Sequence, residues 1–174
     1  MTLAALGTPA AVEVIELREI AVDITNNLLT GFPNASLRGV TRAVTGADGL
    51  IVVTPVFAAS YSGLFKSFFD VVEEDALADM PVLLAATGGT ERHSLVLEHQ
   101  MRPLFAYLRT VVVPTSVFAA SIDWGENDKR EGTLQRRVER AAAAELARLV
   151  VDRPGGSTSD DLVSAPFEDL LLHR

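Results

Sequence analysis

One short apolar run constrains the fold of this chain more than any other feature. Residues 50–53 (Leu-Ile-Val-Val) are consecutive apolar residues, and Thr54 and Pro55 follow them directly. The run is too short for a free-standing helix and is rich in β-branched residues. Pro55 ends it, because proline has no N–H for a ladder. The pattern predicts a strand buried on both faces, which is typical of a parallel sheet covered by helices.

After this strand the sequence takes on the period of a helix. Leu64, Phe68 and Val72 fall on one helical stripe, which predicts a helix from about Tyr61. The loop 54–60 therefore lies between the carboxyl end of a strand and the start of a helix. Ligands of open α/β sheets bind at such places, so this loop is the first candidate site.

The rest of the chain supplies the other elements of an α/β domain. Polar and turn-forming residues predict that the long connection 18–36 has no regular structure. Ser36 is expected to cap the helix that follows it, and Pro103 to kink the helix in which it lies. Pro114 predicts a sheet edge or a bulge in the last strand. The expected further strands are 12–17, 81–86 and 111–118, and the expected further helices are 36–46, 94–109 and 133–149.

Length and local composition predict one domain followed by a tail. Residues 1–150 are expected to form the domain, because a chain of 174 residues is long enough to bury about two-thirds of its unfolded surface. Residues 151–174 are expected to form a flexible linker and a docking tail. The linker is rich in Gly, Ser and Asp, and the tail carries Phe167 and three consecutive leucines, which predict that it docks on this subunit or on a neighbour.

The composition excludes several classes of protein. The chain has no cysteine, which excludes disulfides, thiolate metal sites and a cysteine nucleophile. Its net charge of −8 argues against nucleic acid as a partner, and no apolar run approaches the ~20 residues of a membrane span. His93, His99 and His173 lack the spacing of metal ligands, so by pattern alone they are surface or packing residues. A cytoplasmic location is expected.

Two loop sequences at successive strand ends resemble one known family. Residues 54–66 (Thr-Pro-Val-Phe-Ala-Ala-Ser-Tyr-Ser-Gly-Leu-Phe-Lys) resemble the flavin loop of the flavodoxin-like, NADPH-dependent FMN reductases. Residues 85–90 (Ala-Ala-Thr-Gly-Gly-Thr) resemble that family's second flavin loop. The likeness runs from about residue 12 to residue 150, and it is nearest to reductases that supply reduced FMN to two-component monooxygenases. It implies an α/β fold of the flavodoxin-like, three-layer type with a parallel sheet.

The resemblance also implies which residues bind the cofactor. Backbone N–H groups of the two loops would bind the flavin, and the small residues 58–60 would leave one face of the ring open to nicotinamide. Arg92 and His93 would meet a nucleotide phosphate, and for Arg92 an exposed position at the start of a helix stays open as the alternative. The residues expected to bind FMN or the nicotinamide nucleotide are Thr54, Pro55, Val56, Phe57, Ser60, Thr87, Gly88, Gly89, Thr90, Arg92 and His93. No catalytic side chain and no metal ligand are expected.

The implied activity is hydride transfer from NADPH or NADH to the N5 atom of FMN. Reduced FMN would pass to a partner monooxygenase, and the chain would form a homo-oligomer. Two alternatives stay open. One is a quinone or azo reductase on the same scaffold, and the other is a non-catalytic, flavodoxin-like interaction subunit.

The start of the chain departs from the family. Members have an earlier strand, a phosphate loop rich in Ser and Thr and a long helix, and residues 1–6 resemble only the last turn of that helix. In the strand order 2-1-3-4-5, the earlier strand lies between the strands expected at 12–17 and 50–53. We therefore expect this chain to lack the first strand and the phosphate loop.

This departure predicts that the 174-residue chain binds FMN weakly. Each charge-assisted hydrogen bond lost from the phosphate costs on the order of 1.5–3 kcal/mol, so the usual preference for FMN over riboflavin should shrink. Titration of both flavins against this chain and against an N-terminally extended chain measures the effect. Tight binding of FMN by the short chain would contradict the prediction.

Overall fold

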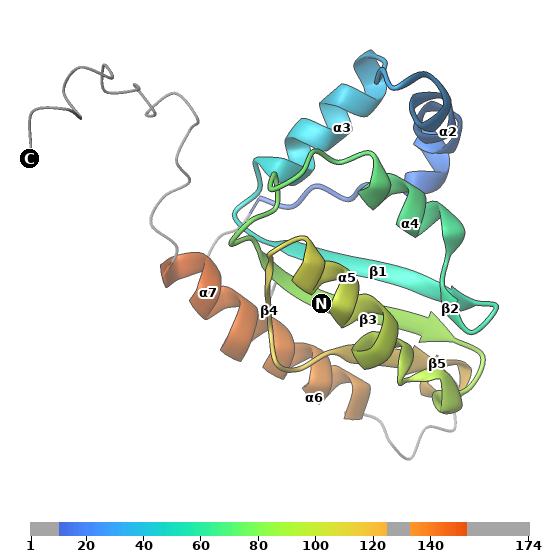
Figure 1. Ribbon diagram of the computed structural model, residues 1–174. Helices are drawn as coiled ribbons and strands as arrows, with labels where there is room; N and C mark the ends of the chain where they lie inside the picture. Colours follow the sequence, from blue (N-terminus) through green and yellow to red (C-terminus); the bar gives the residue numbers. More distant parts are fainter. Residues whose placement is uncertain (1–10, 125–132, 153–174) are drawn as a thin grey trace, which may run out of the picture.

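A five-stranded, mostly parallel sheet lies between two layers of helices in the computed structural model, which describes residues 11–124 and 133–152 (Figure 1). Strand β3 is central and pairs in parallel with β1, β4 and β5. Strand β2 lies antiparallel to β1 as the second arm of a hairpin. The strands are β1 (Leu50–Phe57), β2 (Ser60–Tyr61), β3 (Pro81–Gly88), β4 (Val111–Val112) and β5 (Val117–Ala120). The predicted parallel sheet is therefore confirmed, apart from this short hairpin arm.

Helices cover the two faces of the sheet unequally (Figure 1). The larger layer holds α2 (Ala21–Thr30), α3 (Ala35–Thr45), α4 (Gly63–Asp70) and α5 (Arg102–Tyr107). The smaller layer is one continuous helix, made of α6 (Thr133–Glu139), a π-helical segment (Arg140–Leu146) and α7 (Ala147–Asp152). Among the described residues, no helix combines the length and the apolar character needed to cross a bilayer.

Alternation along the strands divides the core into two clusters. Val52, Val82 and Leu84 face the larger layer, where Phe65, Phe69 and Phe105 are also buried. The centroid of the Phe69 ring lies 4.9 Å from those of Phe65 and Phe105, at angles that favour edge-to-face contact. Leu83 faces the opposite way and is buried with Val113, Val117, Ala141 and Leu146 under the smaller layer.

The smaller layer reaches the start of β1 but does not cover the strand. A Cβ placed on Gly49 would lie 2.7 Å from Val150 Cγ2, so the last helix packs directly on the backbone there. Further along the same face of β1, Ile51, Val53 and Phe57 are 41%, 56% and 63% exposed. The sequence prediction that this strand is buried on both faces is therefore wrong for one face.

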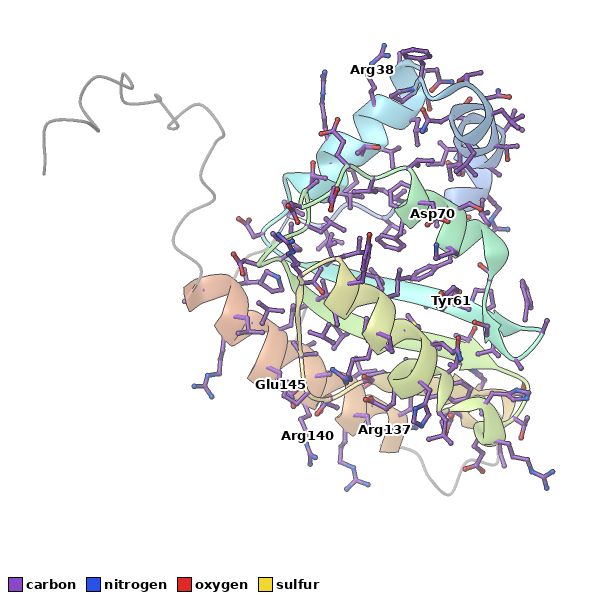
Figure 2. The ribbon with its side chains drawn as sticks, viewed as in Figure 1. Arg38, Tyr61, Asp70, Arg137, Arg140 and Glu145 are labelled. Atoms are coloured by element: carbon purple, nitrogen blue, oxygen red, sulfur yellow. The ribbon has the colours of Figure 1, made fainter. Side chains whose placement is uncertain are left out.

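One carboxylate fixes the last helix to the connection between β4 and β5. Glu145, labelled in Figure 2, accepts hydrogen bonds from the Thr115 backbone N–H at 2.7 Å and from the Thr115 hydroxyl at 2.5 Å. Pro114 lies in this connection, and the predicted strand 111–118 is divided there into β4 and β5. The prediction of an irregularity at Pro114 is confirmed.

The strand predicted at 12–17 is absent. Residues 11–16 have no regular structure, a 3₁₀ turn spans Leu17–Ile20, and Val12 and Val14 are exposed. A strand is stabilised by pairing with a neighbour, and none of the described strands pairs with this segment. Residues 12–17 alternate as residues of a strand do, but the neighbouring strand that such a strand would need is not among the described elements. The prediction of a strand there is therefore wrong.

The connection 18–36 contains a helix that the sequence analysis missed. Ile20 and Ile24, four residues apart, are buried in the larger cluster, and α2 packs against α4. Gly31 ends α2 in a left-handed conformation with φ 77°. Asn34, and not Ser36, caps α3, because its side-chain oxygen accepts a hydrogen bond from the Leu37 N–H at 2.9 Å.

Pro103 widens its helix. The Arg102 N–H donates to the carbonyl of Leu97, five residues earlier, so Leu97–Met101 forms a π-helical turn just before the proline. Proline cannot donate the bond that an α-helix needs at this position, and a π-turn is one way in which a helix accommodates the loss. The predicted disturbance at Pro103 thus takes the form of a wider turn.

The position of α2 predicts a large difference between two of its residues. Ile24→Ala should lower the free energy of unfolding by about 2–5 kcal/mol, because Ile24 is fully buried. Leu29→Ala, on the exposed side of the same helix, should change it by less than about 0.5 kcal/mol. Urea unfolding of both variants measures the difference, and equal effects would contradict the packing of α2 on the core.

Candidate functional site

The carboxyl ends of β1 and β3 lie side by side. Pro55 pairs with Thr87 in the parallel register, so the loops that leave these strands start from neighbouring positions. The β1–β2 turn forms one side of the site, and residues 88–90 form the other. The two loops that the sequence analysis selected are therefore adjacent in the structure.

Thr54 holds the first loop from inside the protein. Its side chain is fully buried, and its hydroxyl accepts a hydrogen bond from the Ser62 N–H at 3.0 Å. Ser62 in turn caps α4, because its own hydroxyl accepts from the Phe65 N–H at 3.2 Å. The Thr54 side chain therefore positions the loop and is not exposed to a ligand.

Two alanines with left-handed backbone form the tip of this loop. Ala58 and Ala59 have φ values of 47° and 67°, and Phe57 pairs with Ser60 on either side of them. A two-residue hairpin with positive φ at both positions is the type I′ turn, in which Asn-Gly is the usual choice. Each alanine in this conformation costs about 1–2 kcal/mol relative to a right-handed one. The turn thus keeps a strained backbone and presents only methyl groups at its tip.

Four backbone amides at these loop tips are available to a ligand. The N–H groups of Ala58, Ala59, Gly89 and Thr90 donate to no acceptor in the part of the chain that the structure describes. All four lie next to the paired ends of β1 and β3. Val56 and Phe57, by contrast, take part in the hairpin with β2.

The two glycines at the end of β3 differ in surroundings. A Cβ on Gly88 would lie 2.9 Å from Phe118 Cζ, so Gly88 allows close packing of β3 on an aromatic side chain of β5. A Cβ on Gly89 would meet nothing within 4 Å. Neither glycine has a positive φ. Only Gly89 therefore faces open space on the ligand side.

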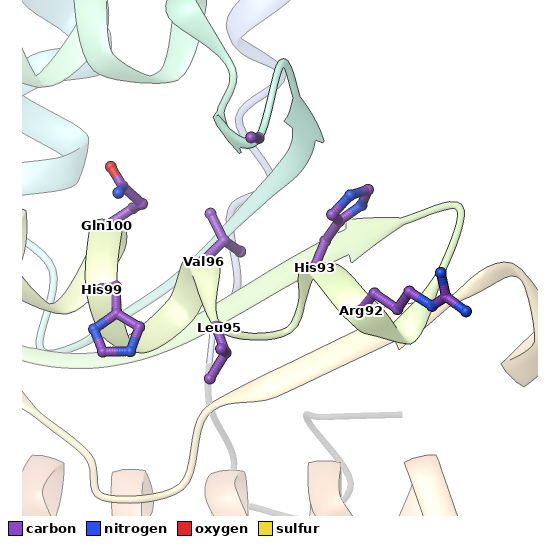
Figure 3. A pocket seen from close by; sticks show the side chains of 7 residues that line it. Arg92, His93, Leu95, Val96, His99 and Gln100 are labelled. Carbon is purple, nitrogen blue, oxygen red and sulfur yellow. The ribbon is translucent and has the colours of Figure 1, made fainter.

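A hollow of about 180 Å³ lies beside these loops (Figure 3). In the close-up, the side chains of His93, Val96 and Gln100 point toward the β1–β2 turn, and those of Leu95 and His99 point the other way. The hydroxyl of Ser60 lies 3.4 Å from Gln100 Oε1, and this contact links the β1–β2 hairpin to the π-helical turn 97–101. The lining residues are Ala59, Arg92, His93, Leu95, Val96, His99 and Gln100.

An ion pair fixes the helix that carries the hollow. Arg102 binds Glu98 through two hydrogen bonds, of 2.6 Å and 3.0 Å, and also donates to the Ser116 hydroxyl at 2.9 Å and to the Val113 carbonyl at 3.3 Å. The hydrogen bonds from Arg102 lower the pKa of the Glu98 carboxyl below its ordinary value. The π-helical turn is thereby tied to the β4–β5 connection.

The structure sorts the residues predicted from sequence into three groups. Arg92 and His93 line the hollow, and Gly88, Gly89 and Thr90 lie at the end of β3. Thr54, Pro55, Val56, Phe57 and Thr87 lie in the paired ends of β1 and β3, and Ser60 begins β2. Ala59 belongs to the small residues 58–60 that were expected at the site, whereas Leu95, Val96, His99 and Gln100 were not predicted as lining residues. The spacing of His93, Val96 and Gln100 on one side of a helix, after a Gly-Gly loop, is the signal that points to them.

Comparison with known proteins identifies the family of this chain and agrees with its fold. The family model for NADPH-dependent FMN reductase matches residues 2–125. The chain is 42% identical over 142 residues to an FMN reductase (NADPH) of Pseudomonas aeruginosa, an alignment that covers 80% of this chain and 76% of the relative. It is 43% identical over 140 residues to the NADH-dependent FMN reductase SfnE of Pseudomonas putida, with 80% and 70% covered.

A solved structure is similar over most of its length. An oxidoreductase from Corynebacterium diphtheriae superposes with a TM-score of 0.81 at 46% identity, covering 87% of this chain and 84% of that one. The chain belongs to the NADPH-dependent FMN reductase family.

The buried hydroxyl of Thr54 predicts a difference between two substitutions. Thr54→Val should cost about 1–3 kcal/mol of stability, because it leaves the Ser62 N–H buried without an acceptor. Thr54→Ser keeps the hydroxyl and should cost clearly less. Thermal unfolding and amide hydrogen exchange of residue 62 measure both effects. If valine and serine were tolerated equally, the hydroxyl would not be what holds the loop.

Proposed function

We propose that this chain catalyses the reduction of FMN by NADPH or NADH, with the flavin ring bound over the paired ends of β1 and β3. One observation carries the proposal: four backbone amides on adjoining loops, at residues 58, 59, 89 and 90, donate to no acceptor among the described residues. Small side chains surround them. A planar ring with an acceptor-rich edge needs this combination of close backbone approach and fixed donors.

The residues of the chain have positioning and electrostatic roles in this proposal. FMN supplies the redox chemistry, because its ring accepts the hydride from the nicotinamide. Gly89 and Thr90 would donate their N–H groups to the pyrimidine edge of the ring, and fixed donors at that place would stabilise negative charge. The methyl groups of Ala58 and Ala59 leave room above the ring for the nicotinamide. No side chain is required to move a proton.

The described residues fit the ring better than the phosphate of FMN. The available amides cluster at the strand ends, beside the hollow. The part of the chain covered by the structure contains no loop rich in Ser and Thr at this edge of the sheet. The proposal therefore assigns residues to the isoalloxazine ring and none to its phosphate.

We also propose the partners that the family resemblance implies. An open site allows reduced FMN to leave, as transfer to a separate monooxygenase requires. Val22, Leu29 and Phe32 are 72%, 80% and 81% exposed, and they supply an apolar surface at which copies of the chain would associate. A location in the cytoplasm agrees with the use of NADPH or NADH as substrate.

Turnover measurements separate this proposal from its alternatives. Oxidation of NADPH and NADH should depend on added FMN, and quinones or azo dyes should be slower acceptors than FMN. Faster reduction of a quinone or an azo dye would favour the alternative activity. Absence of turnover in a folded chain with bound flavin would favour the non-catalytic alternative.

The different surroundings of the two glycines give a sharper test. Gly89→Val should lower affinity for flavin by at least about tenfold, because it places a branched side chain over the donors, while thermal stability stays unchanged. Gly88→Ala should instead cost about 1–3 kcal/mol of stability, because its Cβ meets Phe118. Riboflavin titration and thermal unfolding measure both. Unchanged affinity for flavin in the Gly89 variant would contradict binding of the flavin ring at this loop.

A further inference from the structure

We propose that the last residues of this chain, 162–174, bind to the open face of β1 in the same subunit. That face carries a row of four residues, Ile51, Val53, Pro55 and Phe57, which we call the β1 stripe. Residues 162–174 lie outside the described residues, and sequence analysis predicts only that they dock on this subunit or on a neighbour. The inference concerns a surface of the sheet and does not depend on the proposed FMN reductase activity.

The first support is that the β1 stripe is apolar and exposed along its whole length. Residues two apart in a strand point to the same side, so the four residues form one continuous row. All four are exposed, whereas Val52 and Thr54 between them are buried. The row extends over about 20 Å at the usual rise per residue of a strand. Helices usually cover both faces of a parallel sheet, so this row is a face that still needs a cover.

The second support is the place where the last described helix ends. Ile51 pairs with Leu83, which is buried under this helix, so the β1 stripe faces the same layer. The helix packs on the start of β1, where a Cβ on Gly49 would lie 2.7 Å from Val150 Cγ2. In Figure 1 it reaches β1 only at its α7 end and lies away from the strand at its α6 end. Because α7 ends at Asp152, the chain leaves the helix beside the first residues of the stripe.

The third support is the length and the composition of the chain that follows α7. Nine residues, 153–161, separate the helix from the tail, and they can span at most about 30 Å. The tail can therefore reach every part of the β1 stripe. Burial of apolar side chains is favourable, and six of the 13 tail residues are large and apolar. These six are Leu162, Val163, Phe167, Leu170, Leu171 and Leu172.

The sequence pattern of the tail suits a single apolar row. After Pro166, the residues Phe167, Leu170 and Leu171 have the i, i+3, i+4 spacing of one side of a helix. Glu168 and Asp169 fall outside that side, where water can solvate them. A segment that is apolar on one side only can cover the β1 stripe while its charged residues stay exposed.

Two physical reasons favour the chain's own tail over a second copy of the chain. The start of the stripe lies beside a helix about 10–12 Å in diameter, so the stripe forms the floor of a step. The broad surface of a folded copy would meet this helix first, whereas a single segment fits beside it. A tethered segment also has an effective concentration in the millimolar range at its own subunit.

Cross-linking in the full chain tests the contact directly. The sequence contains no cysteine, so an engineered pair has no background. Val53→Cys combined with Leu170→Cys should form a disulfide under mild oxidation by copper phenanthroline, and the product should have the mass of one chain. The control combines Leu170→Cys with Tyr107→Cys, at an exposed position on α5 in the opposite layer. The first pair should react at least about tenfold faster than the control pair, because contact raises the effective concentration.

A second test removes the contact and leaves the tail unchanged. Val53→Asp places a charge in the β1 stripe and should release the tail. Chymotrypsin, which cleaves after Phe167 and the leucines, should then cut within residues 162–172 at least about tenfold faster than in the wild type, because cleavage follows the population of the open state. Tyr107→Asp should keep the rate within about twofold of the wild type. Circular dichroism checks that both variants are folded.

Three results would overturn the inference. One is equal rates of disulfide formation in the two cysteine pairs. Another is a cross-linked product with the mass of two chains, which would assign the β1 stripe to a second copy. The third is cleavage of the wild-type tail as fast as that of the Val53→Asp variant. Neither measurement uses flavin or nicotinamide, so failure of the proposed FMN reductase activity would leave both results valid.

Discussion

Parallel pairing between β1 and β3 is the constraint on which the rest of this structure depends. It places the carboxyl ends of two strands at one edge of the sheet, with Pro55 opposite Thr87. Loops that leave from that edge must start side by side, whatever their sequences. The buried bond from the Ser62 N–H to Thr54 then directs the first loop back into α4. The second loop leads into the helix that carries the hollow.

The elements predicted correctly are those whose burial requires a recognisable run of apolar residues in the sequence. Residues 50–53 and 81–86 are continuous apolar runs, and both became strands of the central pair. The missed helix α2 is mostly exposed, and its buried side is marked by Ile24 together with Ile20 in the turn just before it. The segment 12–17 has the alternation of a strand, but pairing depends on a neighbour and not on the segment itself. The local sequence pattern was therefore sufficient to predict the strands that form continuous apolar runs. It was insufficient for a segment whose structure depends on pairing with a strand far away in the sequence.

The candidate site was partly predictable for a related reason. Its ring-facing part consists of backbone amides, which every residue except proline carries, so side-chain patterns identify it only through glycines and family resemblance. The left-handed conformations of Ala58 and Ala59 have no signal in sequence, because alanine is not a residue that such turns select. The hollow, by contrast, has side-chain chemistry. His99 was interpreted only as a surface or packing residue and Gln100 was not considered, because the π-helical turn in which they lie was not predicted.

The helix formed by residues 133–152 has a consequence for the order of folding. It provides the only described cover for Leu83, Val113 and Val117, and its end packs on Gly49. During synthesis at 5–20 residues per second, the strand β3 therefore waits on the order of 3–13 s for the helix that buries its second face. Until then one face of the sheet is open to other nascent chains. Newly made chains should consequently depend on chaperones more than the size of the finished domain would indicate.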